Sequence, residues 1–436
     1  MKDRRKLKVL SFAVFAALMS ASSAHADNLL DVYWIAEKND PVLRSADSSR
    51  QVAKERYSQA FAGLLPSVQG SADGRNTRRA YGDIDDSNSS ANFDVGVTQP
   101  VYRQETYKSL NITNARIQQA DAQFSATQRK LMTRVATAYF NVLAAADNLE
   151  FVIAEKEALT RQLDQTKQRF EVGLIAITDV HEAQAAYDLT VASEITAQND
   201  LSNAREVLRE LTGQYHDNLR PLGEMTPTAP EPNDVAKWVD TALRTNFNVA
   251  AAQANVEAAR EEQSRQRAGH MPYVDLIGNY TYSSDAGTSF QNEDLSVSTV
   301  MLKLTVPIYS GGAVSARTRE AAFLYEQAKD SLEQARREAQ RNASAAFLSV
   351  NATISRIKAL GQAVISTESA LKASEAGLEV GTRTTLDVLN TRRELFRARR
   401  DLARARYDHL LSVLQLKEAA GTLSMADFEQ TNALLQ

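Results

Sequence analysis

Short segments recur in the same order in the two halves of this chain, about 207 residues apart, and this duplication is the feature that most constrains its fold. Glu171-Val172-Gly173 returns as Glu379-Val380-Gly381, and Gln99-Pro100-Val101-Tyr102 returns as Val306-Pro307-Ile308-Tyr309. A period this long exceeds that of solenoid repeats, so it indicates a duplicated half-protein.

A cluster of prolines separates the two halves. Four of the nine prolines in the chain fall close together, at Pro221, Pro227, Pro230 and Pro232. Such a cluster is typical of a linker. We therefore expect a first structural repeat at 27–220, a linker at 221–234 and a second structural repeat at 235–436.

The N-terminal segment, residues 1–26, has the composition of a secretory signal peptide. Basic residues precede an apolar run from Val9 to Met19, and Ala24-His25-Ala26 follows as a small-residue cleavage site. The apolar run is too short to cross a bilayer, which disfavours a membrane anchor. We expect the mature chain to begin at Asp27.

Composition excludes several functional classes. The chain carries 50 Lys+Arg against 54 Asp+Glu, and without residues 1–26 the formal charge falls to about −8, which disfavours nucleic acid as a partner. It contains no cysteine, so disulfides and zinc–thiolate sites are excluded. Its five histidines show no metal-ligand spacing. We therefore predict no catalytic residue, no metal and no cofactor.

Seven-residue periodicity dominates both halves and indicates helices that pack as coiled coils. The two rows of the first half are Leu149, Lys156, Leu163 and Phe170, with Val152, Leu159 and Thr166; the matching row of the second half is Ile357, Val364, Leu371 and Leu378. The returning helices carry Val180, Tyr187, Glu194, Leu201 and Leu208, which align with Val388, Leu395, Leu402, His409 and Leu416.

The lengths of the helical patterns predict four rods per chain. The patterns at 103–171 and 312–379 are uninterrupted, and at about 1.5 Å per residue each would be on the order of 100 Å long. The other four patterns, at 29–63, 178–213, 235–269 and 386–421, are about half as long. Stacked in pairs, they would form two composite rods as long as the continuous ones.

Segments with a period of two lie between the helices. Alternation is clear at 274–283 and 299–306, shorter at 93–97, and weakest after Pro66. Segments of about ten alternating residues fit outer-membrane strands. A solvent-exposed hairpin that caps a helical bundle is the alternative, as part of a soluble periplasmic coiled-coil adaptor or structural rod.

Two hairpins per chain cannot close a barrel. Each unpaired backbone group in lipid costs several kcal/mol, so the free edges require sister chains. Two chains would give an eight-stranded barrel, and side chains would fill its interior. Three chains would give a twelve-stranded barrel, which would leave a passage. A conducting function therefore favours a trimer.

Several longer runs closely resemble the TolC family of outer-membrane efflux proteins. They include the run from Ala136 to Leu143, the run from Arg169 to Val180, and Val380-Gly381-Thr382-Arg383 in the second half. The resemblance implies a mixed α and β membrane protein: a trimeric 12-stranded outer-membrane β-barrel continuous with a 12-helix coiled-coil α-barrel in the periplasm. It implies an exit duct for tripartite efflux pumps and type I secretion systems.

The resemblance also implies partners. These are two sister copies in a homotrimer, outer-membrane lipid, a periplasmic adaptor (membrane fusion) protein, and an inner-membrane transporter of the RND, MFS or ABC class. The adaptor would dock on the two helix-turn-helix tips, through Gly173, Leu174 and Ile175 on one and Gly381 and Thr382 on the other. From the residues themselves, Gly173 and Gly381 are expected to end long helices in left-handed caps, and Thr178 and Thr384 to start the return helices.

At the pore mouth, the family pattern places Asp387 in an acidic ring that favours cations. The alternative is a solvated aspartate that complements the helix dipole. The family's second aspartate, one helical turn later, is Asn390 in this chain. We therefore expect one acidic ring instead of two, and a weaker block by polyvalent cations.

Closure in the family depends on links between the inner and outer coiled coils. They correspond here to Arg383 with Thr178 and Asp179, and to Gln162 with Glu375. The family's tyrosine is Leu378 in this chain, so its hydrogen bond is lost.

A basic stripe on the last long helix has two readings. It consists of Arg393, Arg397, Arg400 and Arg404. The residues favour a solvated or salt-bridged face, with Glu394 and Asp401 nearby, and leave open a surface for a partner or a sister protomer.

Overall fold

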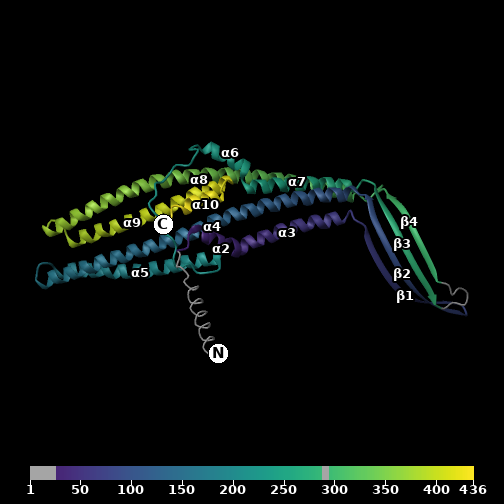
Figure 1. Cartoon of the computed structure of the whole chain (residues 1–436), viewed down its shortest axis with the longest axis horizontal. Helices are drawn as coiled ribbons and strands as arrows, with labels where there is room; N and C mark the ends of the chain where they lie inside the picture. Colours follow the sequence, from purple (N-terminus) through teal and green to yellow (C-terminus); the bar gives the residue numbers. More distant parts are fainter. Residues whose placement is uncertain (1–25, 287–293) are drawn as a thin grey trace, which may run out of the picture. The chain divides into compact units, whose positions relative to one another are not determined.

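The computed structural model describes residues 26–286 and 294–436, so the predicted signal peptide lies outside the described residues except for Ala26. In chain order the elements are α2 (Leu29–Asn39), α3 (Pro41–Ala62), β1 (Ser67–Tyr81), β2 (Ile84–Tyr102), α4 (Gln104–Glu171), α5 (Ile177–Thr212), α6 (Val235–Thr245), α7 (Phe247–Ala268), β3 (Tyr273–Ala286), β4 (Leu295–Thr305), α8 (Ala313–Glu379), α9 (Thr385–Ala420) and α10 (Met425–Asn432) (Figure 1). None of the helices in this part of the chain combines the length and hydropathy needed to cross a bilayer.

The chain divides into two compact units. The helical unit contains Thr127–Asn246 and Gln340–Gln436, together with the N-terminal segment up to Arg44. The strand unit contains Ser45–Ala126 and Phe247–Ala339. The division therefore follows neither repeat, because each repeat contributes to both units.

The seven-residue pattern locates the long helices, but burial follows it only in part: of the five predicted seam positions on α5 only Leu208 is buried, and Phe170 on α4 is exposed. Helices α4 and α8 have 68 and 67 residues, and the return helices α5 and α9 have 36 each. The predicted second row on α4, Val152, Leu159 and Thr166, is buried throughout. On α9, four of the five predicted seam positions are buried, and only Leu402 is half-exposed.

The predicted single helices at 29–63 and 235–269 are wrong, because each is broken once. Asp40 interrupts the first in an extended conformation, which the following Pro41 favours. The buried carboxylate of Asp40 accepts hydrogen bonds from Leu43 N and Arg134. Asn246 interrupts the second, and its amide donates to Ala419 O at 2.9 Å. Tertiary hydrogen bonds thus hold both breaks.

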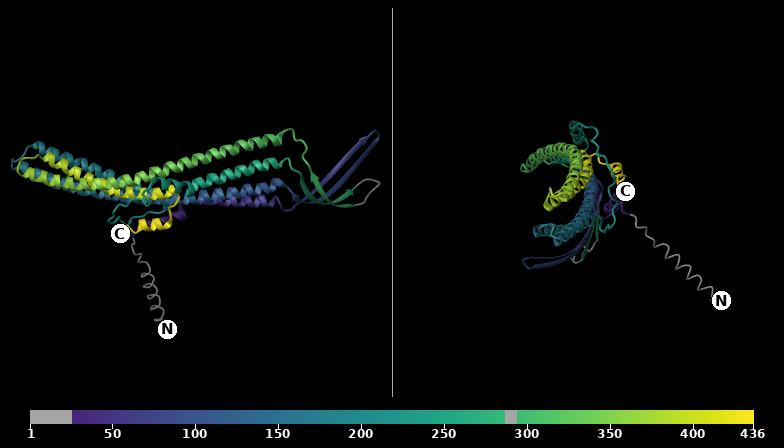
Figure 2. Two further views of the ribbon diagram at one scale, coloured as in Figure 1. Left: turned by 90° about the horizontal axis from the view of Figure 1, so that it is seen from above. Right: turned by 90° about the vertical axis from the view of Figure 1, so that its left-hand side faces the viewer.

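The four strands form one antiparallel sheet in the order β1-β2-β3-β4 (Figure 2). Pairing of β2 with β3, for example Val95 with Tyr280, joins the hairpins of the two repeats. The strands have 15, 19, 14 and 11 residues, so they are longer than the ten predicted. Within the described residues, β1 and β4 each have one edge without a partner, as the sequence predicted.

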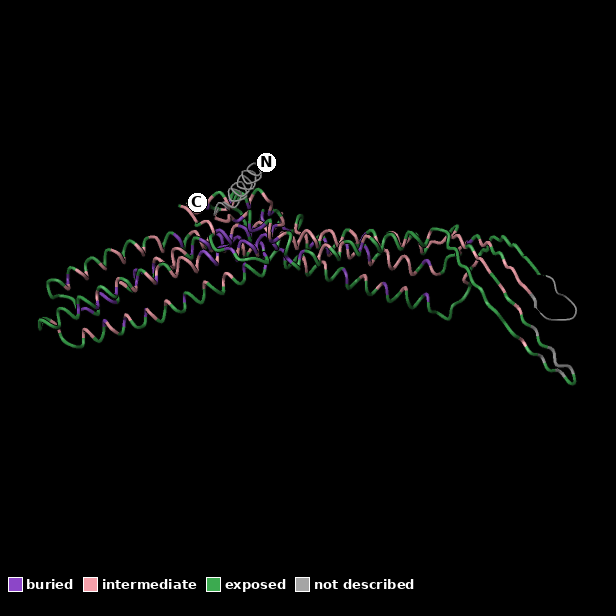
Figure 3. The backbone as a smooth tube through the Cα atoms, turned by 60° about the horizontal axis from the view of Figure 1, so that its bottom comes forward, coloured by how far each residue is buried: buried purple, intermediate pink, exposed green. Residues whose placement is uncertain are grey.

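The outermost strand presents apolar side chains to its surroundings. Val300, Leu302 and Leu304, which alternate along β4, are all well exposed. Strand residues are mostly exposed or half-buried, whereas buried residues gather in the helical unit (Figure 3). An exposed apolar row on an edge strand is typical of a surface that faces lipid.

Ion pairs fasten the helices of the strand unit to one another and to the sheet. Arg103, just before α4, binds both carboxylate oxygens of the buried Asp275 on β3, at 3.0 and 2.9 Å. Lys108 on α4 binds Glu261 on α7, and Arg265 on α7 binds Glu105 on α4. These contacts join elements from both repeats.

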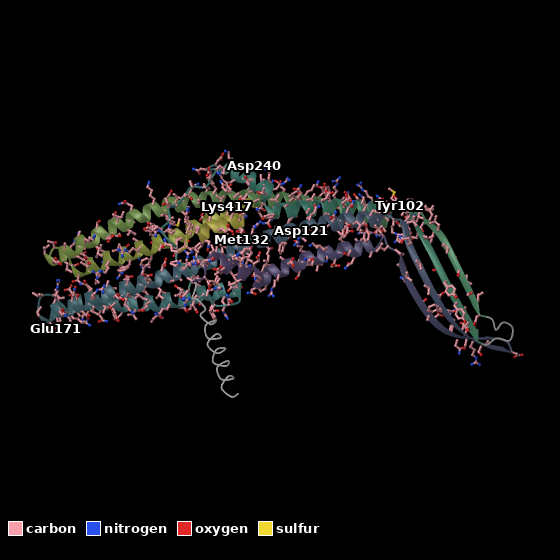
Figure 4. All side chains as sticks on the ribbon, viewed as in Figure 1. Tyr102, Asp121, Met132, Glu171, Asp240 and Lys417 are labelled. Atoms are coloured by element: carbon pink, nitrogen blue, oxygen red, sulfur yellow. The ribbon has the colours of Figure 1, made fainter. Side chains whose placement is uncertain are left out.

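Aromatic pairs on α2, α4 and α10 contribute to the core of the helical unit. Tyr33 packs edge-on against Phe428, and Tyr139 against Phe140. The Tyr139 hydroxyl donates to Asp27 O at 3.1 Å and to Arg220 O at 2.9 Å, which ties the start of the predicted mature chain to the end of the predicted first repeat. Nearby, Lys417, labelled in Figure 4, pairs with Asp427 and holds α10 on α9.

The return helices of the two repeats end at equivalent glycines in different surroundings. Gly213 follows α5 and Gly421 follows α9, both with positive φ. A Cβ on Gly421 would lie 2.7 Å from the carbonyl carbon of Thr245, whereas one on Gly213 would meet its nearest neighbour, Asn39, at 4.0 Å. At Gly421 the second repeat thus leaves no room for a side chain.

We expect Gly421→Ala to lower the Tm of the detergent-solubilised protein by several degrees more than Gly213→Ala. Both variants place alanine in a left-handed conformation, at about 1–2 kcal/mol, and only Gly421→Ala also displaces the main chain around Thr245. Circular dichroism melts measure the difference. Equal losses of Tm would contradict the close packing at Gly421.

Candidate functional site

The candidate site is the pair of helix-turn-helix tips in the helical unit. Helix α4 ends at Glu171, labelled in Figure 4, and Gly173 follows with φ +75°. Leu174 N donates to Arg169 O at 2.9 Å, which is the bond expected after a left-handed glycine cap. At the other tip Gly381 has φ +75°, and Thr382 N donates to Gly377 O at 2.8 Å. The predicted glycine caps are confirmed.

Large apolar side chains are exposed at both tips. Val172 and Leu174 are 70% and 73% exposed, and Val380 is 75% exposed. Gly173, Gly381 and Thr382 are exposed as well, and Ile175 is half-buried. The residues predicted for adaptor docking therefore lie on accessible surface in the protomer.

The two return helices begin differently. Thr384 caps α9: its hydroxyl accepts from Asp387 N at 3.2 Å, and Asp387 accepts from Thr384 N at 2.9 Å. The prediction that Thr178 starts α5 is wrong, because the N-cap is Ala176 and Thr178 already lies within the helix. Ala176 has no side-chain acceptor, so only the carboxylate of Asp179 stabilises this start, by accepting from Ala176 N at 3.2 Å.

Asp387 has a structural role in the protomer. The backbone N–H and the hydroxyl of Thr384, and then the charge of Arg383, lower the pKa of Asp387 below its ordinary value. The carboxylate is therefore ionised at neutral pH. Asn390, one turn later, is exposed. Stabilisation of its own helix, the alternative reading, accounts for these contacts, and a role of Asp387 in an acidic ring stays a prediction.

Two of the residues predicted as gate links lie near each other. Gln162 on α4 and Glu375 on α8 line one groove of about 400 Å³. Among the described residues of the protomer, Gln162 forms no hydrogen bond with Glu375, whose carboxylate instead binds Arg392 at 2.6 Å. The link between Gln162 and Glu375 stays a prediction.

The other predicted link is likewise not formed within one described protomer. The stem of Arg383 packs over Gly377, where an added Cβ would lie 2.7 Å from Arg383 Cγ. Its backbone N–H donates to Gly377 O at 3.1 Å. Thr178 is exposed, Asp179 serves the start of α5, and Leu378 is half-buried.

An apolar seam joins the two coiled coils where the gate was predicted. Leu389 on α9 packs against Leu159 on α4 and Ala186 on α5. The seven-residue rows predicted burial of Leu159, but position 389 lies one residue beyond the predicted row. Burial of both Val388 and Leu389 shows that α9 contacts neighbours on two sides.

Two further sequence predictions concern α9. His409 is packed as expected: its ring nitrogen is 3.1 Å from the Thr353 hydroxyl, and burial lowers the pKa of His409. The basic stripe is largely salt-bridged or hydrogen-bonded, since Arg397 binds Glu394, Arg400 binds Glu155, and Arg404 binds Asn141. Within the described residues, no group of three or more histidine or acidic side chains is arranged to hold a metal ion.

The sequence profile of the outer membrane efflux protein family matches residues 32–214 and 238–422. The chain belongs to this family. The two matched segments correspond to the duplication seen in the sequence.

Curated relatives cover almost the whole chain. The outer membrane protein TolC of Vibrio cholerae serotype O1 is 42% identical over 98% of this chain and 99% of its own length. The proteases secretion protein PrtF of Dickeya chrysanthemi is 30% identical over 99% and 96%. This protein is an outer-membrane channel of the efflux and type I secretion class, and not an enzyme. Proteins of the TolC family function as trimers within tripartite pumps.

The fold matches solved channels of much lower identity. The CmeC outer membrane channel of Campylobacter jejuni superposes with a TM-score of 0.82 at 15% identity, covering 94% of this chain and 90% of that one. The long helices and the four strands per chain are therefore the family's architecture.

The difference between the two caps predicts a difference in local stability. A capping hydroxyl is worth about 1 kcal/mol, which is about fivefold in an opening equilibrium. We expect Thr384→Ala to speed amide hydrogen exchange in the first turn of α9 by about that factor, and Ala176→Ser to slow it in the first turn of α5. Exchange that is unchanged in both variants would show that the caps do not limit opening of the tips.

Proposed function

We propose that three copies of this chain form the exit duct of tripartite efflux pumps and type I secretion systems. The observation that supports this most is the four-stranded sheet with a free edge on β1 and another on β4. In lipid those edges would cost tens of kcal/mol unless paired. Pairing β4 of one protomer with β1 of the next would close a barrel of twelve strands, with twelve helical rods continuing its wall.

We also propose that the adaptor protein docks on the tips. Exposed apolar residues clustered on a helical hairpin are typical of a protein-binding surface. Gly173, Leu174 and Ile175 on one tip, and Gly381 and Thr382 on the other, would receive the hairpins of a periplasmic adaptor. The adaptor would in turn connect the duct to an inner-membrane transporter of the RND, MFS or ABC class.

Opening would proceed by untwisting of the coiled coils, which loosens links at the mouth. Exposed ion pairs are worth about 0–1 kcal/mol each, so a few links in three copies total several kcal/mol. Reversing a closed-to-open equilibrium of 1:99 requires about 5.5 kcal/mol. Docking of an adaptor can supply a difference of that size.

We expect Arg383→Ser to raise single-channel conductance in planar bilayers, because it removes the guanidinium that would link the two coiled coils at Thr178 and Asp179. Arg397→Ser is the matched control, since Arg397 is exposed and binds Glu394, one turn away on its own helix. Equal conductance of wild type and Arg383→Ser would overturn this link. A wild-type protein that forms no conducting pore would overturn the duct itself.

The ionic selectivity of the mouth tests the acidic ring. Asp387→Ala should reduce cation selectivity, because three carboxylates would leave the constriction. Asn390→Asp should increase selectivity and strengthen block by polyvalent cations, since it restores a second ring. Reversal potentials in a salt gradient measure both changes, and a reversal potential that neither variant alters would exclude these positions from the constriction.

A further inference from the structure

Three arginines of α9 cross to α4 within the helical unit. Arg392 Nη1 donates to Ala158 O at 3.2 Å, Arg400 Nη1 donates to Glu155 Oε2 at 3.0 Å, and Arg404 Nη1 donates to Asn141 Oδ1 at 2.9 Å. Two of the three, Arg400 and Arg404, belong to the basic stripe of the sequence. Together they connect α9 to α4 over more than three helical turns.

Two of these contacts are shielded from water. Glu155 is only 7% exposed, and its carboxylate binds Arg400. The side chain of Arg392 is 14% exposed, and it binds α4 and Glu375 of α8 at the same time. A buried charge that loses its partner is much more unfavourable than an exposed one. The contacts of Arg392 and Arg400 should therefore resist separation of the helices.

The apolar seam lies beside these arginines. Leu389, which packs on Leu159 and Ala186, is one turn before Arg392 on α9. A groove between α4, α5 and α9 is lined by Leu389, Arg392 and Arg400 together with Glu155. The arginines thus border the apolar contact and fix the position of α9 along it.

We propose that Arg392, Arg400 and Arg404 form an arginine clamp that holds α9 on α4 and must release before the channel opens. This inference deepens the proposed opening by untwisting and rests on it. Any rotation of α9 away from α4 separates the guanidinium groups from acceptors that α9 does not carry. Arg392 also binds Glu375, so it connects α9 to α8 as well as to α4.

The clamp occupies two members of the basic stripe, Arg400 and Arg404. A docking surface needs guanidinium groups that are free to bind, whereas Arg400 and Arg404 already bind α4. Arg397 borders the same groove, but it is exposed and binds Glu394 on its own helix. The stripe therefore contains two residues that bind α4 and one that binds its own helix.

Single-channel recording of the full-length trimer tests the clamp. We expect Arg392→Gln and Arg400→Gln each to raise open probability at least tenfold, the change that about 1.4 kcal/mol produces. Arg404→Gln should have a smaller effect, because its contact is more exposed. Arg397→Gln is the matched control and should behave as wild type. Trimer migration in gels establishes that each variant assembles.

Charge exchange separates a specific clamp from general loosening. The double variant Glu155→Arg with Arg400→Glu should return open probability toward wild type, and Glu155→Gln alone should raise it. Should the exchanged pair fail to assemble, Glu155→Gln decides, since it keeps the shape of the side chain and removes only its charge. Wild-type open probability in Arg392→Gln, Arg400→Gln and Glu155→Gln would overturn the clamp.

Arg383→Ser in the same recordings distinguishes this inference from the proposed function. If Arg383→Ser opens the channel and the clamp variants do not, the clamp is wrong and opening by untwisting stands. If neither Arg383→Ser nor any clamp variant changes the recordings, opening by loosened helix contacts is wrong as a whole.

Discussion

The need to pair every backbone group that enters lipid governs this structure. In the sheet of one protomer, β2 and β3 have a hydrogen-bonded neighbour on both sides, but β1 and β4 each have one free edge. No arrangement within the described chain removes those edges, so the lipid-facing part is complete only in an assembly. The duplication follows the same logic, because each repeat supplies one hairpin and the β2–β3 pairing joins them.

The two repeats have kept their architecture while their local contacts have diverged. Helices α5 and α9 have equal lengths and end at equivalent glycines, yet one begins at an alanine and the other at a capping threonine. One terminal glycine has space around it and the other touches the main chain at Thr245. Equivalent positions in the repeats therefore cannot be assumed to tolerate the same substitutions.

The sequence predicted what depends on periodicity. Rows of seven residues located the long helices, the burial of Leu159 and the packed state of His409, and alternation located the sheet with its free edges. The breaks at Asp40 and Asn246 were missed, because the helical pattern runs through both and distant hydrogen bonds decide them. Arg392 was missed as well. Its acceptors lie on two other helices, and nothing in local spacing indicates which helices will be neighbours.

One contact of α9 has a genetic consequence. The acceptor that α4 offers to Arg392 is a main-chain carbonyl, at Ala158. A main-chain oxygen persists whatever side chain position 158 acquires, so drift on α4 leaves this bond available. Side-chain substitution removes this contact at position 392 and not at position 158. The Arg400 contact differs, because a substitution of Glu155 on α4 also removes it. Leaky alleles on α4 should therefore map to Glu155 and spare Ala158.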